Sequence, residues 1–76
     1  MRTLKVLLPD DKVVGTLVEH DDLRVIGTDD GGMDILLTMT VLKPGAPDTR
    51  LHPGDRGYLD ALAAEYRSGF YRAVIT

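Results

Sequence analysis

Acidic side chains gather at two turn-like points in the first half of the chain. Asp10 and Asp11 follow Pro9, and Asp29 and Asp30 come just before two glycines. If the fold brought these four carboxylates to one end of a sheet, they could bind calcium or magnesium, which prefer oxygen ligands. The residues after Asp29 lack the ligand alternation and the closing glutamate of an EF-hand loop. Because aspartate is also an ordinary turn former, we expect these acids to be solvated and to bind no metal.

Two histidines and a single serine are the other side chains that could do chemistry. His20 stands beside Asp21 and Asp22, and this group could bind a metal or transfer protons if His52 folded back towards it. No HExxH or comparable metal spacing is present. Ser68 precedes a glycine at the end of a predicted helix, where capping is its expected role. We therefore expect no catalytic residue, no cofactor and no enzymatic activity.

Aromatic and basic residues near the C-terminal end raise the question of nucleic-acid binding. Phe70 and Tyr71 stand between Arg67 and Arg72, and aromatic rings beside arginines can stack on single-stranded nucleic acid. The chain as a whole carries a formal net charge of −3 at pH 7, and so few arginines do not make a continuous basic groove. We therefore expect no nucleic-acid partner.

The length and composition indicate one small domain, which we place over residues 1–76. Cysteine is absent, so neither disulfides nor cysteine-based zinc sites can reinforce its core. No apolar run approaches the roughly 20 residues that span a bilayer. Charged residues also interrupt the first apolar stretch too early for a signal peptide. The sequence therefore predicts a cytoplasmic domain with no membrane partner.

The first half of the chain shows the composition of β-strands separated by turn residues. The strand predicted most clearly covers residues 33–42, where Met33, Ile35 and Leu37 fall on one face at a period of two. The glycine-containing segment before it, residues 29–32, is predicted as a tight hairpin turn. Strands joined by such short loops make an antiparallel meander. The four predicted strands cover residues 4–8, 13–18, 23–28 and 33–42.

The second half of the chain changes to a helical period. Residues 43–48 hold two prolines and a glycine and are predicted to form a stiff crossover. Apolar residues then recur at helical spacing from Tyr58 to Tyr66, and Gly69 marks the end of the helix. Residues 70–75 are predicted as a fifth strand. The expected fold is therefore α+β, a four-stranded meander followed by one amphipathic helix and a closing strand.

A small, partly closed five-stranded barrel is the alternative fold, with the helix between its fourth and fifth strands. Gly15 and Gly27 would then mark the bends that such curvature requires.

Apolar residues on both faces of the predicted strands are the feature that most needs an explanation. One helix can cover only one face of a sheet, so the second face must close into a barrel, meet a copy of itself, or bind another protein. An uncovered strand edge would add a further pairing surface. The residues predicted to form this protein interface are Leu36, Thr38, Thr40, Leu42, Phe70 and Tyr71.

The functional hypothesis that follows is a small, acidic, non-enzymatic protein-binding or regulatory module. Its partner would be another protein or, in a homodimer, a second copy. An accessory or inhibitor protein of a bacterium or phage fits this description. The alternative hypothesis is a domain that binds a small ligand or a metal through the acidic turns.

Overall fold

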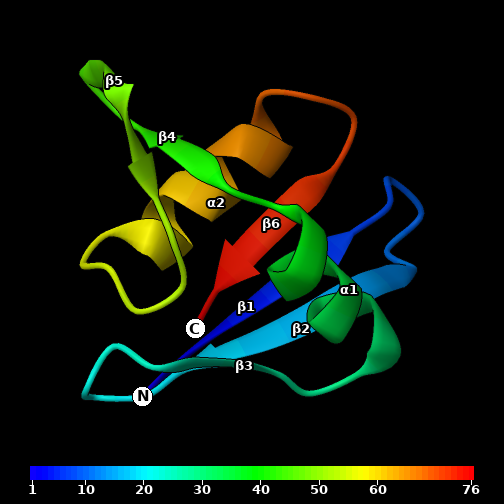
Figure 1. The fold of residues 1–76 in the computed structure, drawn as a ribbon. Coiled ribbons are helices and arrows are strands. Elements are labelled where there is room, and N and C mark those ends of the chain that lie inside the picture. Colours follow the sequence, from blue (N-terminus) through cyan, green and yellow to red (C-terminus); the bar gives the residue numbers. More distant parts are fainter.

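The computed structural model describes residues 1–76 and confirms a small α+β domain with an antiparallel main sheet. The elements are β1 (Arg2–Leu7), β2 (Val13–Glu19), β3 (Val25–Gly27), α1 (Asp30–Thr38), β4 (Val41–Lys43), β5 (Ala46–Leu51), α2 (Tyr58–Arg67) and β6 (Arg72–Ile75). Strands β1, β2 and β3 form a meander, and β6 joins the other edge of β1 (Figure 1). The sheet order β3-β2-β1-β6 leaves the sheet open, so the barrel alternative is wrong.

The register of the main sheet gathers apolar side chains on one face. Leu4 on β1 pairs with Leu17 on β2, and Val6 lies between Gly15 on β2 and Ala73 on β6. Because directly paired residues share a sheet face, these side chains form one surface. Leu4, Val6 and Leu17 are fully buried there, beneath side chains from both helices.

The segment predicted as the fourth strand of the meander is instead mostly helical. Asp30–Thr38 forms α1, and only Val41–Lys43 near its end is a strand, β4, which belongs to a separate hairpin with β5. The predicted hairpin turn before it is also wrong, because the Asp29 carboxylate caps the new helix. Its Oδ1 atom accepts hydrogen bonds from the backbone N–H of Gly32 at 2.7 Å and of Thr16 at 2.9 Å.

Glycines on both sides of the contact bring α1 unusually close to the sheet. A Cβ atom on Gly31 would lie 1.7 Å from the Val14 carbonyl oxygen, and one on Gly32 would lie 2.0 Å from that of Thr16. From the sheet side, a Cβ atom on Gly27 would lie 2.3 Å from the Met33 nitrogen. Gly27 therefore permits close helix packing and does not mark the bend of a barrel.

The helix predicted from Tyr58 to Tyr66 is confirmed as α2, and it packs against more elements than the sequence indicates. Tyr58, Leu59 and Leu62 are fully buried, as the helical spacing predicts. Ala63 on the same face is buried with them, and Ala61 is buried as well, although the helical spacing places it on the other side of the helix. α2 also packs against β4 of the second hairpin. Figure 1 shows α2 between the main sheet and the β4–β5 hairpin. The helix is therefore covered on two sides.

The predicted crossover at residues 43–48 covers the end of β4, the turn of this second hairpin and the start of β5. Gly45 has φ of 79°, a left-handed conformation that favours glycine, and β5 begins at Ala46. Asp55 does not cap α2; its carboxylate accepts a hydrogen bond from the His52 backbone N–H at 2.8 Å, which closes the preceding loop. α2 begins after Gly57, whose φ is 87°.

Two helices, rather than one, cover the core face of the main sheet. The apolar residues of α1 therefore do not belong to a second sheet face. Most of the apolar surface that the sequence predicts on the second face of the sheet is accounted for in this way. The opposite face carries polar Lys5 and Thr16 beside partly exposed Val18, Ile26 and Val74. Neither helix is long and apolar enough to cross a membrane.

Candidate functional site

The acidic turns each have a local structural role and do not assemble into one cluster. Asp29 caps α1, and Asp11 forms an ion pair with Arg72 at the start of β6. The Asp10 carboxylate accepts a hydrogen bond from the Lys12 backbone N–H at 3.1 Å, within its own turn. No group of three or more histidine, aspartate or glutamate side chains is placed to hold a metal ion.

The hydrogen bonds to the Asp29 carboxylate give the domain a testable acid sensitivity. The Thr16 N–H and the Gly32 N–H hold the pKa of Asp29 below its usual value. A lowered folded-state pKa stabilises the native state above the unfolded pKa of about 3.9, and this contribution is lost as the pH falls through the folded value. Asp29→Asn keeps an oxygen acceptor but cannot titrate. Urea unfolding between pH 2 and 7 should therefore give a flatter pH dependence for Asp29→Asn than for the parent chain.

A second variant at this position, Asp29→Ala, distinguishes the contribution of the capping hydrogen bonds from that of the Asp29 charge. Asp29→Ala removes both hydrogen bonds and should lower the free energy of unfolding by about 1–2 kcal/mol at neutral pH. Asp29→Asn should be close to the parent chain there. Equal acid slopes for the parent chain and Asp29→Asn would show that the Asp29 charge does not contribute to folding.

The histidines and the serine also have local contacts. His52 Nδ1 lies 3.7 Å from the carboxylate of Asp55, and both side chains are exposed. The backbone of His20 closes the turn before β3, where its N–H donates to the Arg24 carbonyl oxygen at 2.8 Å. The Ser68 hydroxyl donates to the Glu65 carbonyl oxygen at 2.7 Å, at the end of α2, as expected for a capping serine.

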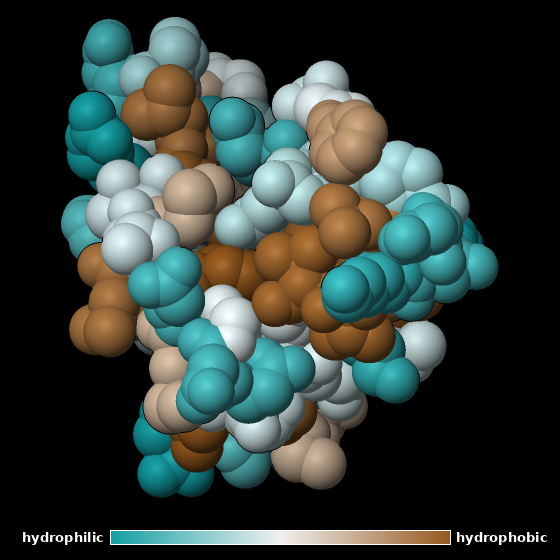
Figure 2. Space-filling model, turned by 90° about the vertical axis from the view of Figure 1, so that its right-hand side faces the viewer, coloured by the Kyte–Doolittle hydropathy of each residue, from teal (hydrophilic) through white to brown (hydrophobic).

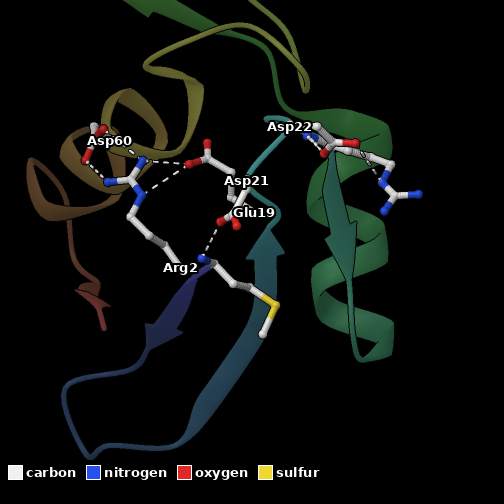
Figure 3. A network of polar contacts seen from close by, with 7 residues as sticks. Arg2, Glu19, Asp21, Asp22 and Asp60 are labelled. Atoms are coloured by element: carbon white, nitrogen blue, oxygen red, sulfur yellow. Dashed lines mark hydrogen bonds and ion pairs between the residues drawn. The ribbon is translucent and has the colours of Figure 1, made fainter.

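An ionic cluster that the sequence reasoning missed connects the sheet to α2. The Arg2 guanidinium donates to Glu19 Oε1 at 2.9 and 3.1 Å and to the two oxygens of Asp60 at 3.0 and 3.1 Å (Figure 3). Glu19 is only 5% exposed, and its Oε2 atom has no hydrogen-bond partner. The Arg2 hydrogen bonds hold the pKa of Asp60 below its usual value. This cluster is a structural clamp between β1, β2 and the first turn of α2.

The residues predicted as an interface do not share one sheet face, because α1 is a helix. Leu36 packs half-buried against the core, and the Thr38 hydroxyl donates back to the Asp34 carbonyl oxygen at 2.8 Å. Thr40 accepts a hydrogen bond from Arg50 at 3.2 Å, and Leu42 is half-exposed on β4. The two remaining residues of the predicted set, Phe70 and Tyr71, do lie together, in the groove described next.

The groove encloses about 370 Å³ at the C-terminal end of α2. It is open to solvent and its size is near the lower end of the range for ligand sites in proteins. Three aromatic rings in its lining contact one another in sequence, with Tyr71 between Tyr66 and Phe70. Tyr66 and Tyr71 have ring centroids 5.3 Å apart at 84°, and Phe70 and Tyr71 have centroids 5.7 Å apart at 80°. The lining residues are Met39, Glu65, Tyr66, Gly69, Phe70 and Tyr71.

Contacts from three parts of the chain hold this groove in shape. The Tyr58 hydroxyl donates to the Met39 carbonyl oxygen at 3.3 Å, which joins the segment after α1 to α2. The Gly69 N–H donates to the Tyr66 carbonyl oxygen at 3.2 Å and turns the chain towards β6. Arg67 Nε donates to the Ala73 carbonyl oxygen at 2.8 Å. The aromatic residues therefore lie between two anchored segments.

Exposure and charge distinguish the groove from the core beneath it. Phe70 is 67% exposed, although phenylalanine is among the residues most often buried. Burial, together with the nearby Asp34 carboxylate, raises the pKa of Tyr66, so its hydroxyl stays protonated at neutral pH. Glu65 is the only charged residue in the lining. The groove is therefore aromatic, partly solvated and negative.

Apolar surface extends beyond the groove on this side of the molecule. Figure 2 views the side on which α1, the β1–β2 turn and the α2–β6 loop lie, and shows apolar surface across the middle between hydrophilic margins. Exposed apolar side chains of these segments include Val13 beside the turn, Leu37 on α1 and Phe70 in the loop. Leu37 is 85% exposed. The segments on this side of the molecule therefore carry exposed apolar side chains besides Phe70.

The two edge strands of the main sheet, β3 and β6, are less suited than the groove to binding a partner. β3 has only three residues, Val25–Gly27, which is short for strand addition. On β6, the Ala73 carbonyl oxygen already accepts a hydrogen bond from the side chain of Arg67.

Comparisons with protein-family models, with characterised proteins and with solved structures find no match to this chain. The functional proposal therefore depends on the geometry alone.

Proposed function

We propose that the chain is a small, non-enzymatic protein-binding module, acting in the cytoplasm as an accessory or inhibitor protein. In this proposal the aromatic groove receives an extended segment of another protein. The observation that carries the proposal is the exposure of Phe70, 67%, at an open groove that two half-buried tyrosines also line. Exposed aromatic residues around a concavity are the typical anchors of protein interfaces.

The arrangement of the other polar side chains supports binding rather than catalysis. A hydrolase requires a nucleophile within hydrogen-bond reach of a base, which is in turn oriented by a third group. Here the Ser68 hydroxyl donates to a backbone carbonyl, and His52 lies beside Asp55 in a different loop. The groove itself is lined by aromatic rings, a thioether, a glycine and one carboxylate.

Charge favours a different protein over a second copy as the occupant of the groove. In a twofold-symmetric dimer the same surface patch is buried on both copies, so two Glu65 carboxylates would enter one interface. The whole chain is also negative, at −3. Like charges placed together in an interface cost binding energy. A partner with neutral or basic residues is therefore favoured over a homodimer built on this groove.

Phe70→Ser should abolish most of the binding at the groove. We would select peptides from a random display library on the parent chain and measure their affinities by calorimetry. The selected peptides should bind Phe70→Ser about tenfold or more weakly, because a central aromatic anchor typically contributes most of an interface's energy. Since Phe70 is exposed, the variant should keep its fold, which its amide spectrum verifies.

Ile26→Ser is the matched control, because Ile26 is also apolar, 42% exposed, and lies on the opposite face of the sheet. Its peptide affinity should equal that of the parent chain within about twofold. A library that yields no peptide sensitive to Phe70→Ser would refute the proposed function. Peptides sensitive to Ile26→Ser instead would place the binding surface on the open sheet face.

A further inference from the structure

We propose that the aromatic groove binds the guanidinium group of an arginine side chain in the partner protein. This inference rests on the proposed function and adds to it the chemistry of the residue that the groove recognises. It depends on three features of the groove: the perpendicular aromatic rings, the lining carboxylate, and the engagement of the neighbouring arginines elsewhere.

The aromatic rings supply surfaces that attract cations. The faces of tyrosine and phenylalanine rings carry negative charge density, and arginine is the cation most often found over them. Tyr71 stands nearly perpendicular to both Tyr66 and Phe70, at 84° and 80°. In each of these edge-to-face pairs the edge of one ring meets one face of the other, so each ring has at most one of its faces covered by that contact. A planar guanidinium group can stack on an uncovered ring face while its edge remains free for hydrogen bonds.

The lining of the groove contains one carboxylate and no basic side chain that would neutralise it. Glu65 is the only ionised side chain among the lining residues. Asp34 on α1 lies close enough to the Tyr66 hydroxyl to act on it electrostatically. A carboxylate can accept two parallel hydrogen bonds from a guanidinium group, which favours arginine over lysine.

The chain's own arginines nearest in sequence do not fill this role. Arg67 Nε donates to the Ala73 carbonyl oxygen at 2.8 Å. Arg72 forms an ion pair with Asp11 from the β1–β2 turn. Neither residue lines the groove. The negative groove therefore complements a cation that comes from outside the chain.

The test uses two probes of nearly the same shape, the cationic acetyl-arginine N-methylamide and its neutral citrulline analogue, in which a carbonyl oxygen replaces one NH2 group of the guanidinium. Each would be titrated into the uniformly ¹⁵N-labelled chain at low salt, and binding followed by amide chemical shifts. The arginine probe should shift the amides of residues 65–71 and of Met39 in a saturable way. Citrulline should bind about tenfold more weakly, since the cation–π attraction and the ionic hydrogen bonds are lost.

Two variants that each remove one negative charge separate the local carboxylate from the overall charge. Glu65→Gln should weaken the arginine probe about threefold to tenfold and reduce its advantage over citrulline. Asp48→Asn changes an exposed acid on β5 and should leave both affinities within about twofold.

The outcomes distinguish this inference from the proposed function. Equal binding of the two probes, no saturable shift with the arginine probe, or equal effects of Glu65→Gln and Asp48→Asn would each overturn the arginine assignment. Peptides selected on the parent chain can still lose affinity with Phe70→Ser in any of these cases, and the proposed function would then stand without a basic anchor. Peptides insensitive to Phe70→Ser would refute the proposed function itself.

Discussion

Gly31→Ala should lower the free energy of unfolding by about 1–3 kcal/mol, the typical cost of overpacking a well-packed contact. A domain of this size is stable by roughly 4–11 kcal/mol, so the loss is a large fraction of the total. The added methyl group would lie 1.7 Å from the Val14 carbonyl oxygen and 2.8 Å from its carbonyl carbon. These are backbone atoms of the central sheet and cannot rotate away as a side chain can. α1 would have to move off β2.

Gly69→Ala is the matched control for this substitution. A Cβ atom at Gly69 would have its nearest neighbour at 3.8 Å, an ordinary van der Waals contact, and Gly69 has no left-handed backbone. We expect its unfolding free energy to stay within about 0.5 kcal/mol of the parent chain. Urea unfolding followed by circular dichroism measures both variants. Equal stability of Gly31→Ala and the parent chain would contradict the close packing of α1 on the sheet.

Arg2→Met should lower the free energy of unfolding by about 2 kcal/mol, because it leaves the Glu19 carboxylate buried without its partner. The loss should stay below the roughly 3–5 kcal/mol typical of a fully buried pair, since the Arg2 side chain is 39% exposed. Asp60 also loses its ion pair, but it is exposed enough to be solvated by water. The clamp between the sheet and α2 is then absent.

Two further variants test this explanation. Adding Glu19→Gln to Arg2→Met should recover part of the lost stability, because the buried charge is removed. Lys5→Met, on the same strand but exposed on the open face, should change stability by less than about 0.5 kcal/mol. If Arg2→Met and Lys5→Met were equally harmless, or if Glu19→Gln lowered the stability of Arg2→Met further, the proposed role of the clamp would be wrong.

The sequence predicts those elements whose apolar residues show a single period. In α2, Tyr58, Leu59 and Leu62 fit only a helical spacing, and the structure buries all three. The strands β1 to β3 and the closing strand β6 lie where β-branched residues and turn residues place them. These parts of the prediction needed no information from tertiary contacts.

The segment from Met33 to Leu42 is ambiguous because apolar residues occupy seven of its ten positions. Such a run matches a period of two and a period of 3.6 equally well. What decides for a helix is the cap at Asp29 and the close fit of Gly31 against the sheet. Both depend on β2, which lies some fifteen residues earlier in the chain. This one difference accounts for the additional helix α1, for the β4–β5 hairpin and for the faces on which the apolar residues lie.

The groove was partly visible in the sequence. Phe70 and Tyr71 were predicted interface residues, and they line it. The helical spacing predicts Tyr66 on the buried face of the helix and the period of two predicts Met39 on a strand, while no pattern singles out Glu65. These residues come together because α2 ends against the segment that follows α1. The one signal in the sequence was the closeness of Tyr66 to Phe70 and Tyr71 around the helix end.

The central claim, that the aromatic groove is the binding surface, is tested most directly by mapping where a selected peptide binds. A peptide chosen on the parent chain would be added to the ¹⁵N-labelled protein, and the amide shift changes assigned to residues. We expect the largest changes at Met39 and at residues 65–71, with little change at Lys5, Val18 or Ile26. Changes centred on those three residues of the open sheet face, with residues 65–71 unaffected, would contradict this claim.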